Sequence, residues 1–362
     1  MKITKVKLGL LDIPLHKPFK TALRTVEEVS EVIVCMETDK GLVGFGEAPP
    51  TAKITGDTQE SIIAAIENHL APAIVGRDCT ELNLLLDGVQ NAIAGNSSAK
   101  AAVDIALHDL WGKAIGLSVH KLFGGGKEEI MTDMTISVDE PKIMAEDAKK
   151  AVAQGYRTLK VKVGMDGELD ITRLCSIRKS VGQDVQIRID ANQGWTPGEA
   201  VRTLKQMEAE GLAIEFCEQP TKADDIAALR YVRERVTTPI MADESVHSAR
   251  DALAVMQQGA ADLINIKLMK AGGLREARHI CDLAELFGVE CMIGCMLEGK
   301  ASAAAAAHLA ASHPIITKID LDGPLLFAQD PMDGGASFIG PEITLDGEPG
   351  FGIKTIKGVR WL

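Results

Sequence analysis

The sequence predicts an α/β protein built around a barrel of eight parallel strands. From residue 129 to 322, eight short apolar segments alternate with amphipathic ones, as strands alternate with helices in such a barrel. Charged residues recur at intervals of 28, 28, 25 and 24, each at the end of an apolar segment: Lys162, Asp190, Glu218, Asp243 and Lys267. An open doubly wound sheet is the rival fold, but the eight regular units lack a Gly-x-Gly-x-x-Gly fingerprint, which favours the barrel.

Each strand is predicted from an apolar run, and each helix from the amphipathic stretch that fills one of the seven gaps. The expected strands are 132–137, 157–163, 185–190, 213–218, 239–243, 263–267, 289–294 and 316–322. Thr196-Pro197 and Glu140-Pro141 open two of the helices with proline in the first turn. The span of 194 residues is just below the ~200 of a complete eightfold barrel, so we expect a (β/α)7β, TIM-like barrel without the last helix.

The segments on either side of the barrel have a different pattern. Residues 1–125 read as an α+β cap, with strands at 2–13, 32–37 and 42–47, helices near 57–75, 80–93 and 97–116, and lid loops near 17–26 and 51–58. The barrel then occupies 126–322. We expect the last segment, 323–362, to return to the cap, so that both termini share one domain.

Composition narrows the class of partner. The chain has 362 residues, 46% of them hydrophobic, and a formal net charge of -12, which disfavours nucleic acid and anionic membranes as partners. No run reaches the ~18 apolar residues of a membrane span, and the seven cysteines include no Cys-x-x-Cys pair. We therefore expect a cytoplasmic enzyme that acts on a small molecule. A homo-oligomer is also expected, although no residue pattern fixes the number of copies.

Three of the recurring charges predict a metal site. Asp190, Glu218 and Asp243 end three consecutive strands, and barrel active sites form at the carboxyl ends of the strands. A set of carboxylate oxygens without His or Cys suits Mg²⁺, with Mn²⁺ as the alternative, rather than zinc. The prediction is one Mg²⁺ per subunit.

The two lysines predict the reaction. Lys162 and Lys267 end strands four positions apart, on opposite sides of the barrel mouth, so one could remove a proton from a carbon and the other return one to the opposite face. The proton would be α to a carboxylate, whose enediolate the metal stabilises. A lysine base needs a pKa lowered to ~7–8, which burial and the neighbouring cations Lys160 and Mg²⁺ could arrange.

The strand-end motifs resemble a known family. Residues 159–163 (LKVKV), 189–192 (IDAN), 218–220 (EQP), 242–245 (ADES) and 265–270 (NIKLMK) are similar to signatures of the muconate-lactonizing subgroup of the enolase superfamily. The resemblance covers nearly the whole chain and implies an enolase-like fold with a capping domain, a (β/α)7β barrel and Mg²⁺. It also implies that Lys162 and Lys267 are the acid/base pair and that Lys160 contacts the substrate carboxylate. Cycloisomerases, o-succinylbenzoate synthases, N-succinylamino-acid racemases and dipeptide epimerases remain open.

The eighth strand favours one of these activities. Asp320 and Asp322 lie two residues apart, on one face of the strand, and four strands from Glu218. A pair of acids there attracts a substrate ammonium and repels the anionic substrates of the other activities. An ammonium, a carboxylate and an epimerisable carbon describe a dipeptide, and the pair resembles the ammonium-binding motif of dipeptide epimerases. In that family the positions of Thr135, Cys295, Met296 and Leu297 line the substrate site.

The lid loops suggest the side chain of the second residue. They resemble those of L-Ala-D/L-Glu epimerases, where an arginine at the position of Arg24 favours Glu, and a guanidinium suits a carboxylate. The chain has Cys295 where the Glu-specific members lead us to expect Ser. The sequence thus predicts a Mg²⁺-dependent dipeptide epimerase, most suited to L-Ala-D/L-Glu, and the resemblance implies a role in murein peptide metabolism. The alternatives are a hydrophobic or other second residue, or a lyase or cycloisomerase of the same subgroup.

Overall fold

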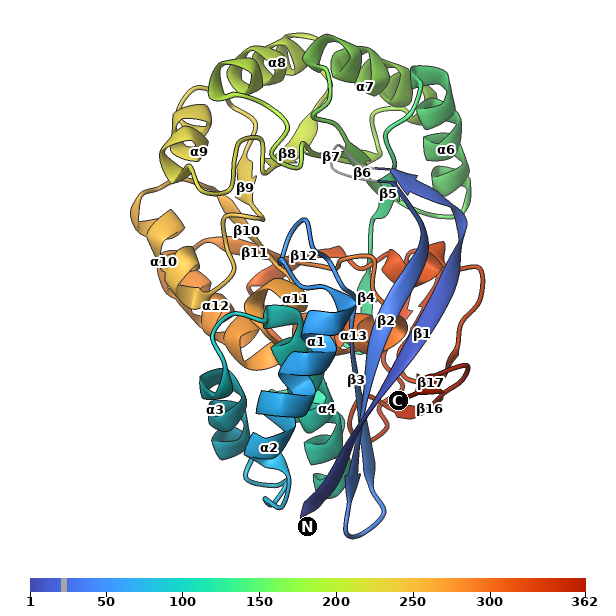
Figure 1. The fold of residues 1–362 in the computed structure, drawn as a ribbon. Helices are drawn as coiled ribbons and strands as arrows, with labels where there is room; N and C mark the ends of the chain where they lie inside the picture. The colour runs from blue at the N-terminus through green and yellow to red at the C-terminus, as the bar shows by residue number, and fades with distance from the viewer. Residues whose placement is uncertain (21–24) are drawn as a thin grey trace.

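The centre of the molecule is a sheet of eight parallel strands that curves into a barrel (Figure 1). The computed structural model describes residues 1–20 and 25–362. Along the sheet the strands follow chain order: β5 (Met134–Ile136), β6 (Thr158–Lys162), β7 (Gln186–Asp190), β8 (Ile214–Glu218), β9 (Ile240–Ala242), β10 (Leu263–Ile266), β11 (Glu290–Gly294) and β12 (Ile316–Asp320). These are the eight predicted strands, each one to three residues shorter than expected.

The two outer strands of this sheet approach each other and nearly close the barrel. β5 and β12 form no ladder, but the backbone N–H of Asp133 donates to the carbonyl of Ile319 (3.3 Å). The N–H of Leu321 donates to the Thr132 hydroxyl at 2.8 Å, and that of Thr135 to the Asp322 carboxylate at 2.7 Å. Side chains thus complete the contact that strand pairing leaves open.

Helices cover the outside of the barrel (Figure 1). They are α6 (Pro141–Ala153), α7 (Gly167–Val181), α8 (Pro197–Ala209), α9 (Ile226–Arg233), α10 (Ala249–Gln257), α11 (Leu268–Ala271), α12 (Leu274–Phe287) and α13 (Lys300–Ser312). Thr196 caps α8 in a reciprocal capping box with Glu199, and Pro197 occupies its first turn as predicted. The seven expected gaps each contain a helix, and the gap after β10 contains two.

The N-terminal cap is an antiparallel sheet with helices packed on it. Its strands are β1 (Ile3–Lys20), β2 (Thr25–Thr38) and β3 (Val43–Ala48), and its helices are α1 (Gln59–Ala65), the π-helix Ile66–Leu70, α2 (Ala71–Ile74), α3 (Leu82–Ala92), α4 (Ser97–Ile115) and α5 (Val119–Leu122). α4 packs directly on β3, where a Cβ on Gly46 would lie 2.0 Å from the Ala102 carbonyl oxygen. Glycine is therefore required at this close approach of helix to strand.

Two expectations for the cap can be compared with the structure. Of the expected lid loop 17–26, residues 17–20 belong to β1 and 25–26 to β2, while 21–24 lie outside the described residues. The predicted helix near 57–75 is divided into α1, a π-helical turn and α2. In Figure 1 the β1–β2 ribbon reaches β5 and α6, and Lys20 forms an ion pair with Asp139 at 2.9 Å. The backbone N–H of Val138 also donates to the Lys20 carbonyl at 3.2 Å, so the ribbon contacts the barrel through backbone as well as side chain.

The C-terminal segment returns toward the cap. It contains β13 (Met332–Gly334), β14 (Ser337–Ile339), β15 (Glu342–Thr344), β16 (Ile353–Ile356) and β17 (Arg360–Trp361). β17 pairs with β1, with Trp361 opposite Gly9, while β15 pairs with β4 (Glu129–Met131) just before the barrel. No helix in the described part of the chain is both long and apolar enough to cross a bilayer.

Candidate active site

The strand ends place four charged side chains side by side at the barrel mouth. In the parallel ladders Lys162 is opposite Asp190, Asp190 is opposite Glu218, and Glu218 is opposite Met241, two residues before Asp243. Lys267 follows β10, which is four strands from β6. The regular spacing in the sequence therefore corresponds to one level of the barrel, with the two lysines on opposite sides.

Each carboxylate of the predicted metal site contacts a lysine. Lys162 Nζ lies 2.6 Å from Asp190 Oδ2, and Lys267 Nζ lies 2.8 Å from Asp243 Oδ2. Lys270, from α11, lies 2.6 Å from the other oxygen of Asp243. The three carboxylates are fully buried. Four lysines, including Lys160, therefore neutralise charges that would otherwise be costly to bury.

The donor set nevertheless fits a divalent cation. Among residues 1–20 and 25–362, no three Asp, Glu, His or Cys side chains converge closely enough to form a ready-made metal centre. However, Asp190, Glu218 and Asp243 offer only oxygen ligands, and Glu218 Oε2 and Asp243 Oδ1 accept no well-directed hydrogen bond despite being buried. Such oxygens suit a hard cation such as Mg²⁺, so the chemistry of the residues agrees with the prediction.

Burial and neighbouring charges shift the pKa values in opposite directions. Burial and the Asp190 charge raise the pKa of Glu218 to about 8. Burial also disfavours the charged form of Asp190, but Lys162 and Lys160 hold its pKa at about 2. For Lys267 the attraction of Asp243 outweighs burial and raises the pKa. The lowered lysine pKa expected from the sequence depends on a neighbouring Mg²⁺ and stays a prediction.

Lys160 links the two ends of the site. Its ammonium lies 2.7 Å from Asp320 Oδ2, 2.8 Å from Glu218 Oε2 and 3.3 Å from Asp190 Oδ2. Burial would lower the pKa of Lys160, but these carboxylates hold it well above its usual value. Burial and the charge of Asp320 raise the pKa of Asp322 to about 6. The ammonium of Lys160 therefore lies between Asp320, at the end of β12, and the predicted metal ligands Glu218 and Asp190.

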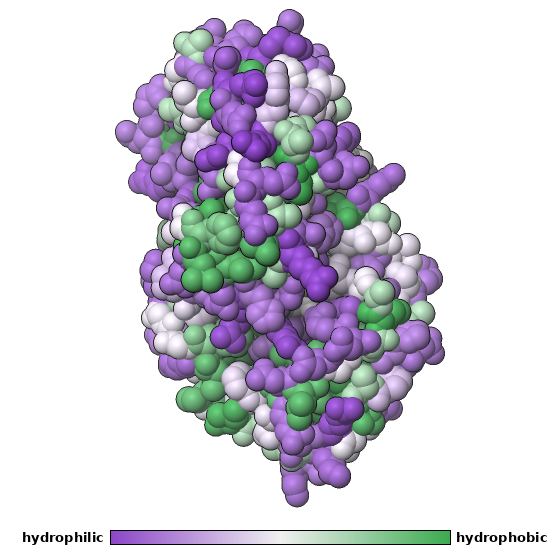
Figure 2. Space-filling model, turned by 90° about the vertical axis from the view of Figure 1, so that its left-hand side faces the viewer, coloured by the Kyte–Doolittle hydropathy of each residue, from purple (hydrophilic) through white to green (hydrophobic). Residues whose placement is uncertain are grey.

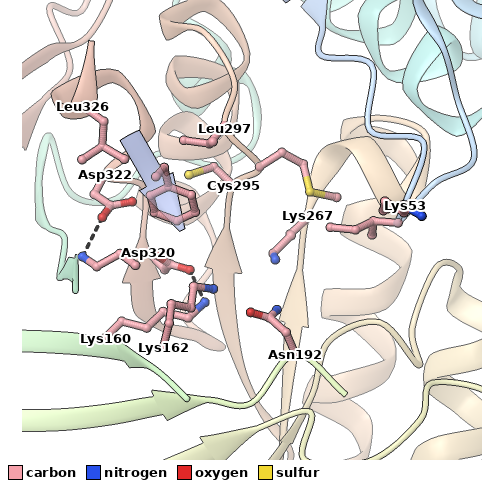
Figure 3. Close-up of a pocket in the computed structure, with 14 residues that line it drawn as sticks. Lys53, Lys160, Lys162, Asn192, Lys267, Cys295, Leu297, Asp320, Asp322 and Leu326 are labelled. Carbon is pink, nitrogen blue, oxygen red and sulfur yellow. Dashed lines mark hydrogen bonds and ion pairs between the residues drawn. The ribbon is translucent and has the colours of Figure 1, made fainter. Parts of the chain in front are cut away.

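Most of the predicted substrate residues surround one pocket, shown in Figure 3. It is lined by Phe19, Lys53, Ile54, Thr135, Lys160, Lys162, Asn192, Lys267, Cys295, Met296, Leu297, Asp320, Asp322 and Leu326. The two lysines of β6 enter from the side opposite Lys267, while Cys295 and Leu297 form a wall above (Figure 3). Asp190, Glu218 and Asp243 are not part of the lining. Arg24 lies outside the described residues.

The sequence analysis missed several polar groups of the site. Asn192 lines the pocket and donates to Glu244 Oε1 at 3.2 Å, and Asn265 donates to Glu218 Oε1 at 2.7 Å. Lys270 pairs with Asp243 and donates to its carbonyl oxygen. Asn265 lies in β10, two positions before Lys267, so the two-residue period of a strand could have indicated it. Asn192 follows the end of β7 with a φ of 43°, where no strand period applies. Lys270 lies one helical turn after Lys267, and only the fold reveals its contact.

Comparison with known proteins agrees with this fold and site. Residues 143–357 match the model of an enolase C-terminal domain-like family. Residues 4–124 match that of the mandelate racemase / muconate lactonizing enzyme N-terminal domain. The two matches together cover most of the chain and divide it close to the start of the barrel.

Relatives with known activity resemble the chain over its full length. An L-Ala-D/L-Glu epimerase from Clostridium acetobutylicum is 53% identical over 99% of this chain and 100% of its own. The substrate-liganded structure of the L-Ala-D/L-Glu epimerase from Bacillus subtilis has a TM-score of 0.97, with 48% identity over 98% of this chain and 99% of that one. A dipeptide epimerase from Enterococcus faecalis, complexed with Mg and L-Leu-L-Tyr, has a TM-score of 0.95 and 42% identity over 98% and 100% of the two chains. The chain therefore belongs to the enolase superfamily, and within it to the family of mandelate racemase and muconate lactonizing enzyme.

Proposed function

We propose that the protein is a Mg²⁺-dependent dipeptide epimerase that inverts the α-carbon of the C-terminal residue. The observation that carries the proposal is the pocket itself. Lys162 and Lys267 line it from opposite sides, and Asp320 and Asp322 line its far end. An α-carbon between two ammonium groups can lose a proton to one and gain a proton from the other, which inverts its configuration.

Lys162 and Lys267 are the proposed acid/base pair. For exchange in each direction, one lysine must be neutral and the other protonated. Both lysines are almost completely buried, which excludes bulk water from the proton transfer. In the structure each ammonium is held by a carboxylate, Lys162 by Asp190 and Lys267 by Asp243. These contacts fix the positions of both nitrogens beneath the pocket.

Asp190, Glu218 and Asp243 would hold one Mg²⁺ per subunit, with Mn²⁺ as an alternative. When bound, the ion would supply positive charge for the substrate carboxylate and for the enediolate that forms as the α-proton leaves. The support is the set of buried carboxylate oxygens at the ends of β7, β8 and β9. Structures of related dipeptide epimerases contain Mg together with a dipeptide.

The remaining polar groups would orient the dipeptide. Asp320 and Asp322 would bind the amino terminus, and Lys160, beside Asp320, would contact the carboxylate of the C-terminal residue. Thr135 holds Asp322 through its backbone N–H and lines the same end of the pocket. Cys295, Met296 and Leu297 form the neighbouring wall. These contacts would place the α-carbon within reach of both lysines.

The favoured substrate is L-Ala-D/L-Glu, with a role in cell-wall peptide recycling. Two relatives, 53% and 49% identical, are L-Ala-D/L-Glu epimerases. Arg24 is the proposed ligand of the glutamate side chain. A hydrophobic second residue is the specific alternative, since a relative 42% identical is a hydrophobic dipeptide epimerase and Phe19, Ile54 and Leu326 line this pocket. The other alternative is a lyase or cycloisomerase of the same subgroup.

Domain division, assembly and location complete the proposal. Residues 1–125 would form the cap, 126–322 the barrel, and 323–362 the segment that returns to the cap, as the pairing of β17 with β1 supports.

We expect a cytoplasmic homo-oligomer. Large apolar side chains exposed on the described surface, such as Leu286, support self-association, and Figure 2 shows hydrophobic patches on an otherwise hydrophilic face.

Deuterium exchange tests the proposal. The enzyme, loaded with Mg²⁺, is incubated with L-Ala-L-Glu in D2O, and the products are followed by NMR and chiral chromatography. We expect α-deuterated L-Ala-D-Glu and L-Ala-L-Glu. A parallel set of L-Ala-L-Xaa dipeptides ranks the second residue. Exchange only with apolar residues would support the hydrophobic alternative, and unchanged dipeptides throughout would refute epimerisation.

A further inference from the structure

Three buried glutamates meet where the cap joins the barrel. Glu31 belongs to β2, Glu47 to β3, and Glu298 to the segment between β11 and α13. They are 0%, 2% and 1% exposed. Within residues 1–20 and 25–362, no Lys, Arg or His forms an ion pair with them at 4.0 Å or less. A cluster of carboxylates without a paired cation is unusual in a protein interior and needs an explanation.

The cap glutamates bind the start of α13. Glu31 Oε1 accepts a hydrogen bond from the Gly299 N–H at 2.9 Å. Glu47 Oε1 accepts from the Ser302 N–H at 2.8 Å and from its hydroxyl at 3.1 Å. The residue before α13, Gly299, has no side chain to cap the helix, so the cap domain supplies the acceptors for its first N–H groups.

The short distance between the Glu47 carboxyl group and the backbone of residue 299 explains why this residue is glycine. A Cβ on Gly299 would lie 2.4 Å from Glu47 Oε2, closer than any real contact, although the Gly299 φ of −70° would suit any residue. The requirement for glycine is therefore the proximity of the carboxyl group and not the backbone conformation. Residues 295–297, immediately before this joint, form the pocket wall.

Three negative charges could not all persist in this cluster. Three of its oxygens are fully buried and accept no hydrogen bond of good geometry, namely Oε2 of Glu31 and both oxygens of Glu298, although Met296 N and Ser302 Oγ lie near Glu298. The other charged groups that face the cluster are Lys267, toward Glu298, and Asp330, toward Glu47. The single positive charge of Lys267 is offset by the negative charge of Asp330, so three ionised glutamates would leave the cluster strongly negative. The glutamates must therefore retain protons.

The direction of the pKa shifts agrees with this geometry. Burial, opposed by hydrogen bonds from Ser302 and Ala301, raises the pKa of Glu47 to about 7. Burial and the charge of Glu47 raise the pKa of Glu298 to about 8, and burial with both neighbours raises that of Glu31 well above its ordinary value. The folded protein therefore binds protons that the unfolded chain releases above pH ~4.5.

We propose that Glu31, Glu47 and Glu298 form a proton-holding joint that fastens the cap to the barrel and positions the Cys295–Leu297 wall of the pocket. The joint stabilises the fold fully below pH ~4.5, and this contribution is lost as the pH rises through the pKa values of about 7 and 8. These glutamates are positioning residues that touch neither substrate nor metal. Their effect on catalysis rests on the function proposed above, whereas their effect on stability does not.

Glu298→Gln is the decisive variant, because glutamine keeps the shape of a protonated glutamate but cannot ionise. Melting temperatures should be nearly equal at pH 5, and the variant should melt about 5–10 °C above wild type at pH 9. Glu290→Gln, at a half-exposed carboxylate on β11 that pairs with Lys318, is the matched control and should show no such gain. A Glu298→Gln protein that melts below wild type by the same amount at every pH would overturn the proposal.

A kinetic measurement separates the joint from the proposed function. With L-Ala-L-Glu, the KM of wild type divided by that of Glu298→Gln should rise about 10-fold between pH 7 and 9, while the ratio of kcat values stays constant. A constant KM ratio would refute the positioning of the wall. If no dipeptide is epimerised, the proposed function fails, but the melting experiment still decides whether the joint holds protons.

A second pair of variants tests the geometry. Gly299→Ala should lower the melting temperature by about 2–8 °C, since overpacking costs typically 1–3 kcal/mol. Adding Glu47→Asp, which shortens the clashing side chain, should recover part of that loss. Gly198→Ala, where the nearest atom is the flexible Arg202 tip at 3.4 Å, should be neutral. Absence of recovery in the double variant would contradict the proposed contact.

Discussion

Replacing Asp320 by Asn should remove most of the affinity for the substrate ammonium. Asp320 is 3% exposed, and its Oδ2 lies 2.7 Å from Lys160 Nζ. Two unit charges 4 Å apart interact by about 4 kcal/mol at an effective dielectric constant of 20. Truncating one member of a buried charge pair costs about 2–5 kcal/mol. We therefore expect the variant to lose about 2–4 kcal/mol of transition-state binding, so that kcat/KM for L-Ala-L-Glu falls roughly 30- to 900-fold.

The assay compares the dipeptide with lactyl-L-Glu, in which a hydroxyl replaces the ammonium. Wild type should prefer the dipeptide strongly, and Asp320→Asn should lose most of this preference, because only the charged substrate uses the carboxylate. Glu215→Gln is the control, since it breaks another ion pair, with Arg188 at 2.7 Å, away from the pocket. Melting temperatures identify any loss of fold. An Asp320→Asn enzyme that retains the wild-type preference would refute the reasoning.

The other predictions concern the lysines, the metal and acid stability. Lys162→Ala and Lys267→Ala should each lower the rate of epimerisation by at least ~100-fold. Each variant should still exchange the α-proton of one epimer slowly for deuterium, and the epimer should differ between the two variants. Exchange with both epimers in either variant would contradict a two-base mechanism. Mg²⁺ at 100 times its Kd should raise wild-type stability by about 2.7 kcal/mol, and calorimetry should show a smaller gain for Glu218→Gln at the same concentration; an equal gain would exclude Glu218 as a ligand. Burial and the neighbouring His120 lower the pKa of His308 to about 3. The His308 imidazole therefore stays neutral in the folded protein, while in the unfolded chain it gains a proton below pH ~6.5. The His308 contribution to stability should therefore fall by roughly 1.4 kcal/mol per pH unit below pH ~6.5, opposite in sign to that of the glutamate joint. In denaturant titrations, the free energy of unfolding of His308→Asn should gain on that of wild type as the pH falls below ~6.5, and a constant difference would contradict the prediction.

Much of the fold was predictable because it depends on local patterns. The eight strands of the barrel are apolar runs at regular spacing, and Thr196-Pro197 and Glu140-Pro141 mark helix starts where the structure has them. The division of the 57–75 helix by a π-helical turn was not predictable, because its apolar periodicity continues through the irregular turn. The length of β1, which runs to Lys20, depends on its pairing with β2 and on contact with the barrel.

The sequence alone determined which chemical groups meet at the barrel mouth, because the carboxyl ends of all strands in a parallel barrel lie at the same end of the barrel. Lys162, Lys267 and the three carboxylates were identified by spacing. Only the tertiary structure decided how these charges are paired. Lys160 bridges Asp320 to Glu218 across the barrel, and Lys267 is paired with Asp243, whose charge raises the lysine pKa. The joint of Glu31, Glu47 and Glu298 joins residues more than 250 positions apart, a distance over which no local pattern carries information.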